Sequence, residues 1–330
     1  MTVMALLTVE GLQVHFGHDE NQVQALYDVD LTIEPGEIVG LVGESGSGKT
    51  VTSLALMGLL DPRSSRIEGR AVLDGQPLWN ERGERNAARR DVPLAMVFQE
   101  PMTALDPVFT VGSQLMETLR TRRGMDKAQA RAESVALLDA VGISDPKARM
   151  KAYPHELSGG MRQRVMIAIA LACDPKLLIA DEPTTAVDVT IQAQLLDLIK
   201  SLARERGMSV LFVTHDLGVV SETCDRMITM YAGRIVERGP VAEVLGSPGH
   251  PYTMGLLAAL PSPGSRGERL ATIPGRVPPP GTTVEGCVFR PRCPFAVDEC
   301  TKPQDLIPLS TAREARCIRS RELDFQGVAR

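Results

Sequence analysis

Residues 38–60 read IVGLVGESGSGKTVTSLALMGLL, and they fall into three short segments of different character. The first five residues are an apolar run, typical of a strand that is buried on both faces. The next eight fit the pattern G-x-x-x-x-G-K-[ST], and from Val51 to Leu60 the apolar residues have helical spacing. A strand, a glycine-rich loop and a helix in this order predict a phosphate-binding loop in an α/β domain.

This loop supplies the groups that a chain of phosphates needs. Its glycines allow backbone N–H groups to point inward, and the following helix directs its positive end toward an anion. Lys49 would neutralise the β- and γ-phosphate oxygens of ATP, and the hydroxyl of Thr50 would ligate Mg²⁺. The alternative is a chance glycine-rich turn, which the flanking strand and helix disfavour. The predicted ATP-binding residues of the loop are Gly43, Glu44, Ser45, Gly46, Ser47, Gly48, Lys49 and Thr50.

A second apolar run, LLIA at residues 177–180, is followed directly by two carboxylates, Asp181 and Glu182. A buried strand of an open α/β sheet delivers ligand-binding groups at its carboxyl end. We expect Asp181 to hold Mg²⁺ through water and Glu182 to act as the general base on the attacking water. On their own, two acids at a strand end can equally be solvated turn residues. The catalytic interpretation therefore depends on the other motifs nearby in the sequence.

One such neighbour is the stretch YPHELSGGMRQR at residues 153–164, in which Ser-Gly-Gly opens a predicted helix. Backbone N–H groups and a hydroxyl at a helix start form an anion site without a lysine. The same three residues, taken in isolation, are explained equally well as an ordinary helix N-cap.

Together these motifs resemble the ATP-binding cassette (ABC) ATPases, over residues 6 to about 240. Six motifs occur in the order found in that family. They are Walker A at 43–50, the Q-loop Gln99 in VFQEP, the signature at 157–161, Walker B at 179–182, the D-loop at 186–188 and the switch His215 in VTHDL. The D-loop departs from the family pattern by having Val187 where Leu is usual.

The resemblance implies a head-to-tail dimer that holds two nucleotides between the Walker A motif of one subunit and the signature of the other. Gln99 would ligate Mg²⁺ and His215 would contact the γ-phosphate. Phe16 stands where the family stacks an aromatic ring on adenine; Tyr27 is the rival, and a core Phe is the third possibility. The residues implied to contact the partner's ATP are Ser158, Gly159, Gly160, Gln163 and Asp188.

A narrower resemblance, extending to residue 317, is to the ATPases of peptide and nickel importers, with the D-type subunit of dipeptide importers as the closest likeness. It is carried by stretches such as QEPMTALDPVFTVGSQLME and HPYTMGLLAALP. It implies ATP hydrolysis coupled to peptide uptake, beside a homologous second ATPase, two transmembrane permease subunits and an extracytoplasmic peptide-binding protein. Near relatives also serve oligopeptides, glutathione and nickel chelates. To residues 250–253, HPYT, we assign only a turn before a short helix.

Four cysteines crowd the last part of the chain, at Cys287, Cys293, Cys300 and Cys317. In a reducing compartment such a cluster indicates a metal site before it indicates disulfides. The spacing is neither the paired C-x2-C of zinc ribbons nor a ferredoxin run, so structural zinc and an iron–sulfur cluster both fit. The importer family carries a [4Fe–4S] cluster on a similar C-terminal arm, and this resemblance favours the cluster over zinc, with free or disulfide-bonded cysteines third.

The order of the motifs predicts an α/β P-loop fold of the ABC nucleotide-binding type. We expect an antiparallel strand layer near the N-terminus, an inserted helical subdomain over about 100–165 and an irregular metal-binding arm. The expected division is an ATPase domain at 1–255 and an importer-type extension at 256–330.

Composition and charge limit the functions and the cellular location that the chain can have. The net charge of −5 gives no electrostatic footprint for nucleic acid. The longest apolar stretch, Val165–Cys173, is far short of the roughly 20 residues of a membrane span. We therefore expect a peripheral protein on the cytoplasmic face of the inner membrane. A soluble ABC ATPase without a transport role would bring two cassettes or a coiled-coil insertion, an exporter would bring fused spans, and Glu182 argues against a non-catalytic module.

Overall fold

The computed structural model describes residues 4–17, 22–80, 83, 92–99, 104–183, 189–260, 272–282 and 284–323, with the backbone alone at 189 and 190. The chain divides into two compact units. The first consists of Met1–Leu6, Glu34–Glu37 and Asn86–Leu211, and the second of Leu7–Ile33, Ile38–Arg85 and Phe212–Arg330. The division falls inside strand β8 (Ser209–Thr214). Each unit is described by itself.

The first unit contains a parallel pair of short strands, β6 (Leu94–Val97) and β7 (Leu177–Asp181), with Leu94 opposite Leu177. Every residue of both strands is buried, which explains why each reads as a continuous apolar run rather than an alternating one. The apolar run at 177–180 predicts β7, which extends one residue further, to include the first of the two acids.

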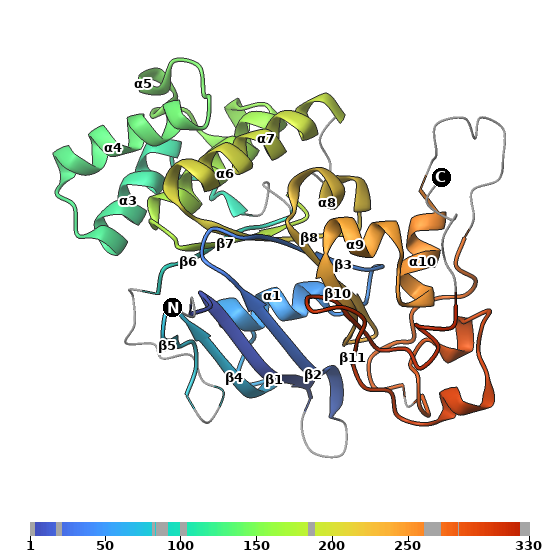
Figure 1. The fold of residues 1–330 in the computed structure, drawn as a ribbon. Helices are drawn as coiled ribbons and strands as arrows, with labels where there is room; N and C mark the ends of the chain where they lie inside the picture. The colour runs from blue at the N-terminus through green and yellow to red at the C-terminus, as the bar shows by residue number, and fades with distance from the viewer. Residues whose placement is uncertain are drawn as a thin grey trace. The chain divides into compact units, whose positions relative to one another are not determined.

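Helices make up the rest of the first unit. They are α3 (Val111–Arg123), α4 (Lys127–Ala140), α5 (Pro146–Arg149), the 3-10 turn η2 (Pro154–Glu156), α6 (Gly159–Ala172) and α7 (Val189–Arg206). Asp126 and Gln129 form a reciprocal capping box at the start of α4, and the left-handed Gly124 ends α3. Helices α3, α4 and α6 pack against one another, as Figure 1 shows in green and yellow-green. The predicted helical subdomain is thereby confirmed.

In the second unit an antiparallel sheet has the strand order β2-β1-β4-β5, built from β1 (Leu7–Phe16), β2 (Val23–Ile33), β4 (Ser65–Leu73) and β5 (Gln76–Pro77). Buried positions largely alternate along β1, so one face of this sheet is covered. The N-terminal strand layer was predicted, whereas β4 and β5 were not. Strand β4 reads SRIEGRAVL, and its charged first half hides the apolar alternation.

The second unit also contains β3 (Ile38–Val42), which pairs in parallel with β9 (Arg226–Tyr231), and β10 (Arg234–Pro240), which pairs antiparallel with β9. The C-terminal arm adds β12 (Glu314–Ala315) to β10 and β11 (Ile307–Pro308) to β12. In Figure 1 this arm is the red part of the ribbon, beside α10. The arm is thus held to the sheet by backbone pairing, although most of it is irregular.

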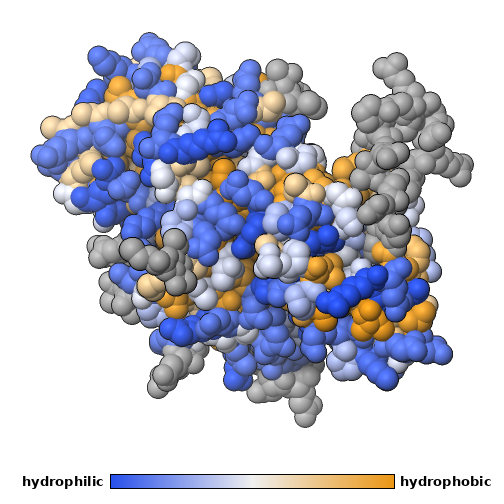
Figure 2. All heavy atoms as spheres, in the orientation of Figure 1, coloured by the Kyte–Doolittle hydropathy of each residue, from blue (hydrophilic) through white to orange (hydrophobic). Residues whose placement is uncertain are grey.

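The helices of the second unit are α1 (Lys49–Met57), α8 (Leu217–Thr223), α9 (Val241–Gly246) and α10 (Pro251–Ala258), with the 3-10 turns η3 (Arg290–Arg292) and η4 (Asp298–Thr301). Within the described parts of both units, no helix has the length and apolar character needed to cross a bilayer. On the face shown in Figure 2, hydrophilic side chains are interspersed with small apolar groups.

Candidate functional site

The glycine-rich loop lies between β3 and α1, as its sequence predicts. Gly48 caps α1 with φ 108°, and Gly43 has φ 155°. A side chain at Gly43 is sterically excluded, because a Cβ there would stand 2.3 Å from the carbonyl oxygen of Met230. Glycine is therefore required at this turn both by conformation and by space.

The polar groups of the loop are arranged as expected for a phosphate site. The Nζ of Lys49 donates to the carbonyl oxygens of Gly43 at 2.7 Å and Glu44 at 3.0 Å, so the cation lies across the loop. The hydroxyl of Ser47 is buried without a hydrogen-bond partner. An orphaned buried hydroxyl in a loop that carries a lysine fits a phosphate ligand. Ser45, Gly46 and Thr50 are exposed on the loop.

The two aromatic candidates for adenine stacking have different surroundings. Phe16 is the last residue of β1, half-buried and paired with Val23 and Ser65. Tyr27 lies on β2, and the guanidinium of Arg234 sits 4.5 Å from its ring centroid. Tyr27 lines a cavity of about 150 Å³ together with Gly46 of the loop. Phe16 is not among the described residues around that cavity. This difference does not decide which of the two rings would stack on adenine.

The predicted switch histidine follows β8. His215 is exposed, and the next residue, Asp216, caps α8 by accepting from the backbone N–H groups of Gly218 and Val219. The Asp216 N–H in turn donates to the hydroxyl of Thr214 at 3.0 Å. His215 thus lies on a turn that is stabilised by hydrogen bonds of Asp216 to Thr214 and to the start of α8.

In the first unit, the predicted general base and the predicted Q-loop residue meet. Asp181 is buried at the end of β7, and Glu182 follows it with φ 44°. This left-handed conformation is uncommon for a residue with a side chain and typical of functional turns. The Nε2 of Gln99 donates to Glu182 Oε2 at 3.2 Å. The sequence predicted both residues, but it gave no sign of this hydrogen bond.

The signature segment begins α6. Ser158 is the N-cap, and its side chain accepts from the backbone N–H of Met161 at 3.3 Å. A Cβ at Gly159 would meet nothing within 4 Å, so the helix start is open at that position. Gln163, one turn further, is buried and donates to the carbonyl oxygen of Pro183 at 2.7 Å. It therefore links the signature helix to the residue after Glu182. Asp188 lies outside the described residues.

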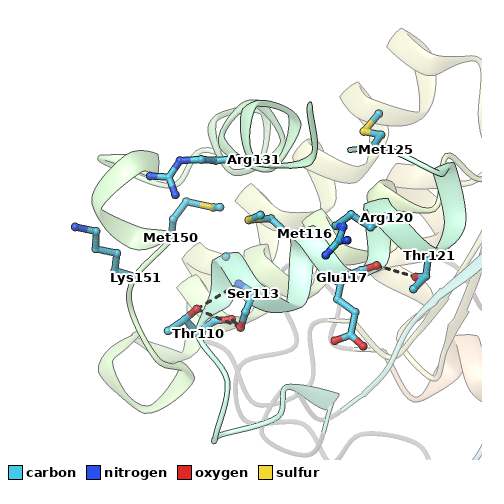
Figure 3. A pocket seen from close by; sticks show the side chains of 11 residues that line it. Thr110, Ser113, Met116, Glu117, Arg120, Thr121, Met125, Arg131, Met150 and Lys151 are labelled. Atoms are coloured by element: carbon cyan, nitrogen blue, oxygen red, sulfur yellow. Dashed lines mark hydrogen bonds between the residues drawn. The ribbon is translucent and has the colours of Figure 1, made fainter. Parts of the chain in front are cut away.

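The predicted residues are divided between the units. The loop 43–50, both aromatic candidates and His215 belong to the second unit, whereas Gln99, Asp181, Glu182 and the signature belong to the first. The first unit also has a hollow of about 850 Å³ beside α3, which contains none of these residues (Figure 3). Its wall includes Met116, Met150, Arg120 and Arg131.

The four clustered cysteines come together in the arm. All four are free thiols and line one cavity with Phe289 and Arg319. Burial, together with the other three thiols, raises the pKa of Cys317 to about 11, and burial also raises the pKa of Cys287 and Cys293. A cation would favour the thiolates, so the donor set suits a thiophilic metal. Among the described residues, however, no group of three or more His, Cys, Asp or Glu side chains has a metal-holding arrangement.

One contact of the loop was missed by the sequence analysis. The hydroxyl of Tyr252, on α10, accepts from the backbone N–H of Glu44 at 2.7 Å, and the Glu44 carboxylate pairs with Arg292 of the arm. For the HPYT stretch, residues 250–253, the sequence predicts only a turn before a helix. Its Pro251 and His250 do start α10, but its tyrosine reaches the glycine-rich loop.

Comparison with known proteins identifies the family. Residues 26–185 match the family described as ABC transporter, and residues 236–300 match the oligopeptide/dipeptide transporter C-terminal region. A protein of Brucella abortus (strain 2308) named for peptide import and ATP binding is 50% identical over 338 residues, which cover 98% of this chain and 99% of that protein. One of Brucella suis biovar 1 (strain 1330), named in the same way, is 49% identical over 312 residues, 94% of each.

Solved structures support the same conclusion. CbiO1 from Clostridium perfringens, part of the ABC transporter complex cbiONQ, has a TM-score of 0.61 and 27% identity, covering 73% of this chain and 90% of that one. The ATP-binding cassette MJ0796, in a dimeric post-hydrolysis state bound to ADP and Pi, has a TM-score of 0.60 and 29% identity, covering 71% and 98%. The chain therefore belongs to the oligopeptide/dipeptide-importer family of ABC transporter ATP-binding proteins, ATPases that couple ATP hydrolysis to transport.

Proposed function

We propose that this ATPase energises the uptake of dipeptides, as a D-type subunit of a dipeptide importer. The observation that carries the ATPase part is the phosphate-type loop with Lys49 across it, together with Glu182 held by Gln99. The cargo rests on the likeness to proteins named for peptide import. Oligopeptides, glutathione and nickel chelates are the alternative cargoes, and an ATPase without a transport role is the remaining alternative.

Each site residue has a role in this proposal. Backbone N–H groups of 43–48 and Lys49 would bind the phosphates, and Thr50, Gln99 and, through water, Asp181 would hold Mg²⁺. When bound, Mg²⁺ would neutralise charge on the β- and γ-phosphates. Glu182 accepts the proton of the attacking water, and His215 contacts the γ-phosphate. Phe16 or Tyr27 would stack on adenine. In the partner subunit's nucleotide site, the contacts would come from Ser158, Gly159, Gly160, Gln163 and Asp188.

The proposed assembly pairs this chain with a homologous second ATPase, two transmembrane permease subunits and an extracytoplasmic peptide-binding protein. The dimeric ATP-binding cassette MJ0796 supports the pairing of cassettes. The protein would act at the cytoplasmic face of the inner membrane. Within the chain, we propose residues 1–255 as the ATPase domain, with its helical part over about 100–165, and 256–330 as the importer-type extension.

We expect the transport assignment to be tested most directly in proteoliposomes that contain the complete importer and its binding protein. A labelled dipeptide should be taken up only with ATP on the side of this subunit. Lys49→Ala should reduce uptake to background, because the cation that neutralises the phosphates is lost. Excess unlabelled tetrapeptide, glutathione or nickel–histidine serves as competitor. Competition by one of these and not by a dipeptide would reassign the cargo, and saturable dipeptide binding by the isolated subunit would contradict the division of roles.

We also propose that Cys287, Cys293, Cys300 and Cys317 hold a [4Fe–4S] cluster, with zinc as the alternative. The convergence of four thiols on one cavity supports a thiolate-bound metal. The cluster, when bound, would staple an arm that has little core of its own.

Metal analysis separates the two metals. Anaerobically purified protein should contain about four iron and four sulfide per chain. Cys287→Ser should lose them, while Cys173→Ser, a cysteine outside the arm, should keep them. Stoichiometric zinc without sulfide would make the arm a zinc site, and protein without either metal would refute both assignments.

A further inference from the structure

We propose that Arg292 is a positioning residue of the nucleotide site, which neutralises Glu44 and makes the affinity for ATP depend on the cysteine arm. This inference rests on the proposed phosphate-binding role of the loop 43–50. Arg292 belongs to the arm and lies 248 residues along the chain from Glu44.

The contact is two-pronged and partly buried. The Nη1 and Nη2 atoms of Arg292 donate to the two carboxylate oxygens of Glu44 at 2.7 and 3.1 Å. The Arg292 side chain is 5% exposed and that of Glu44 31%. The same guanidinium donates from Nε to the carbonyl oxygen of Pro274 at 2.7 Å and from Nη2 to that of Ile273 at 3.2 Å. One arginine therefore joins two arm segments to the loop, in the geometry that only a guanidinium provides.

The backbone of Glu44 is held by a second contact, with Tyr252 of α10. Its N–H donates to the hydroxyl of Tyr252, which is fully buried. The Tyr252 ring lies 4.7 Å from that of Tyr231 and 5.4 Å from that of Phe289, centroid to centroid. Arg292 in turn lies over the Tyr231 ring at 5.7 Å. The loop residue is thus fixed through both its backbone and its side chain by one aromatic cluster.

Charge gives this contact a consequence for binding. Glu44 is the one acidic residue in the sequence GESGSGKT, which is otherwise neutral or basic. A carboxylate in a phosphate-binding loop repels a polyanionic ligand. Pairing with Arg292 cancels that charge, so the loop presents Lys49 without a competing anion. Removal of Arg292 alone would leave the carboxylate both uncompensated and free to turn toward the phosphates.

The same arginine is continuous with the cysteine site. Arg292 ends the turn η3, and the next residue is Cys293. Phe289, which precedes this turn, lines the cysteine cavity and also contacts the rings of Tyr231 and Tyr252. The backbone N–H of Cys287 donates to the carbonyl oxygen of Cys300 at 2.9 Å, which closes the arm around the thiols. A change at the thiols therefore shifts the segment that positions Arg292.

The test measures the affinity of the purified full chain for a fluorescent ATP analogue. Arg292→Gln should raise Kd about tenfold, as expected for an uncompensated partner of an ion pair. Glu44→Gln is measured as the reference for the double variant Arg292→Gln/Glu44→Gln, whose Kd should return most of the way to wild type. Arg292→Lys, which keeps charge but not the two-pronged bond, should give an intermediate value. Arg276→Gln, an exposed arginine of the same arm, is the matched control.

The rescue by Glu44→Gln distinguishes positioning from misfolding, because a misfolded arm would not recover when a loop carboxylate is removed. Unchanged affinity in Arg292→Gln, or no rescue in the double variant, would overturn the proposal. Cys293→Ser should raise Kd in the wild-type background and have no further effect in Arg292→Gln; additive effects would refute the link to the arm. If wild-type protein bound no ATP analogue, the nucleotide site itself would be refuted instead.

Discussion

Glu182→Gln is expected to lower ATP hydrolysis by at least about a hundredfold, the usual contribution of a general base, while ATP still binds. Glutamine keeps the shape of the side chain and can still lie beside Gln99, but it cannot accept a proton from water. The proposed phosphate contacts come mainly from residues 43–50, which the substitution does not touch. Steady-state phosphate release and the Kd of an ATP analogue, measured on the same preparation, separate the two effects.

The control is Glu117→Gln, which removes an exposed carboxylate from α3 of the same unit and should leave turnover unchanged. Normal turnover in Glu182→Gln would remove Glu182 from the role of base. A loss of ATP binding together with turnover would instead indicate that Glu182 shapes the site. Its left-handed backbone (φ 44°) gives a physical reason to test for such a structural role.

The parts of the fold that could be predicted are those whose signal is local. Strands β3, β6 and β7 are buried along their whole length, and each appears in the sequence as an unbroken apolar run. The helical subdomain shows its helices through spacing and through end signals such as the capping box at Asp126. Strand β4 was missed because it starts with charged residues and gains its identity from pairing with β1, which is a long-range property.

The nucleotide motifs can be recognised in the sequence for the same reason, since each places its residues within a few consecutive positions. The contacts between motifs were not. Gln99 and Glu182 are 83 residues apart, and Glu44 and Arg292 are 248 apart. No periodicity relates such residues. Tyr252 is an example. Its sequence neighbours Pro251 and His250 indicate the start of a helix, but nothing in the local sequence indicates that the Tyr252 hydroxyl contacts the glycine-rich loop.

The cysteine spacing left three outcomes open, and the reason is physical. Metal preference depends on how thiolates are arranged around the ion, and an irregular chain can bring four of them together at many spacings. The structure gathers the four thiols around one cavity. All four are free thiols, and the described residues show no metal-holding group, so the metal analysis has to decide among an iron–sulfur cluster, zinc and free thiols.

Arg313→Met is expected to cost about 3–5 kcal/mol of stability, the usual price of leaving a buried charge without its partner. The Glu237 side chain is 0% exposed, and its Oε1 accepts from Arg313 Nε at 3.2 Å and Nη2 at 3.0 Å. Glu237 also accepts from the backbone N–H groups of Gly249 and His250. The pair thus fastens the arm to β10 and to the start of α10. Urea unfolding at pH 7 measures the loss.

The pH dependence and a double variant identify the cause of that loss. Burial raises the pKa of Glu237, and removal of Arg313 raises it further. A carboxyl whose folded-state pKa is raised contributes less stability as pH rises through that pKa, so the deficit of Arg313→Met should shrink as pH falls toward the folded-state pKa of Glu237 in the wild-type protein. Arg313→Met/Glu237→Gln should recover most of the stability at pH 7. Arg70→Met, which breaks the exposed pair with Glu10, should change little. A deficit that is equal at all pH values would mean that Arg313 acts through packing rather than through charge.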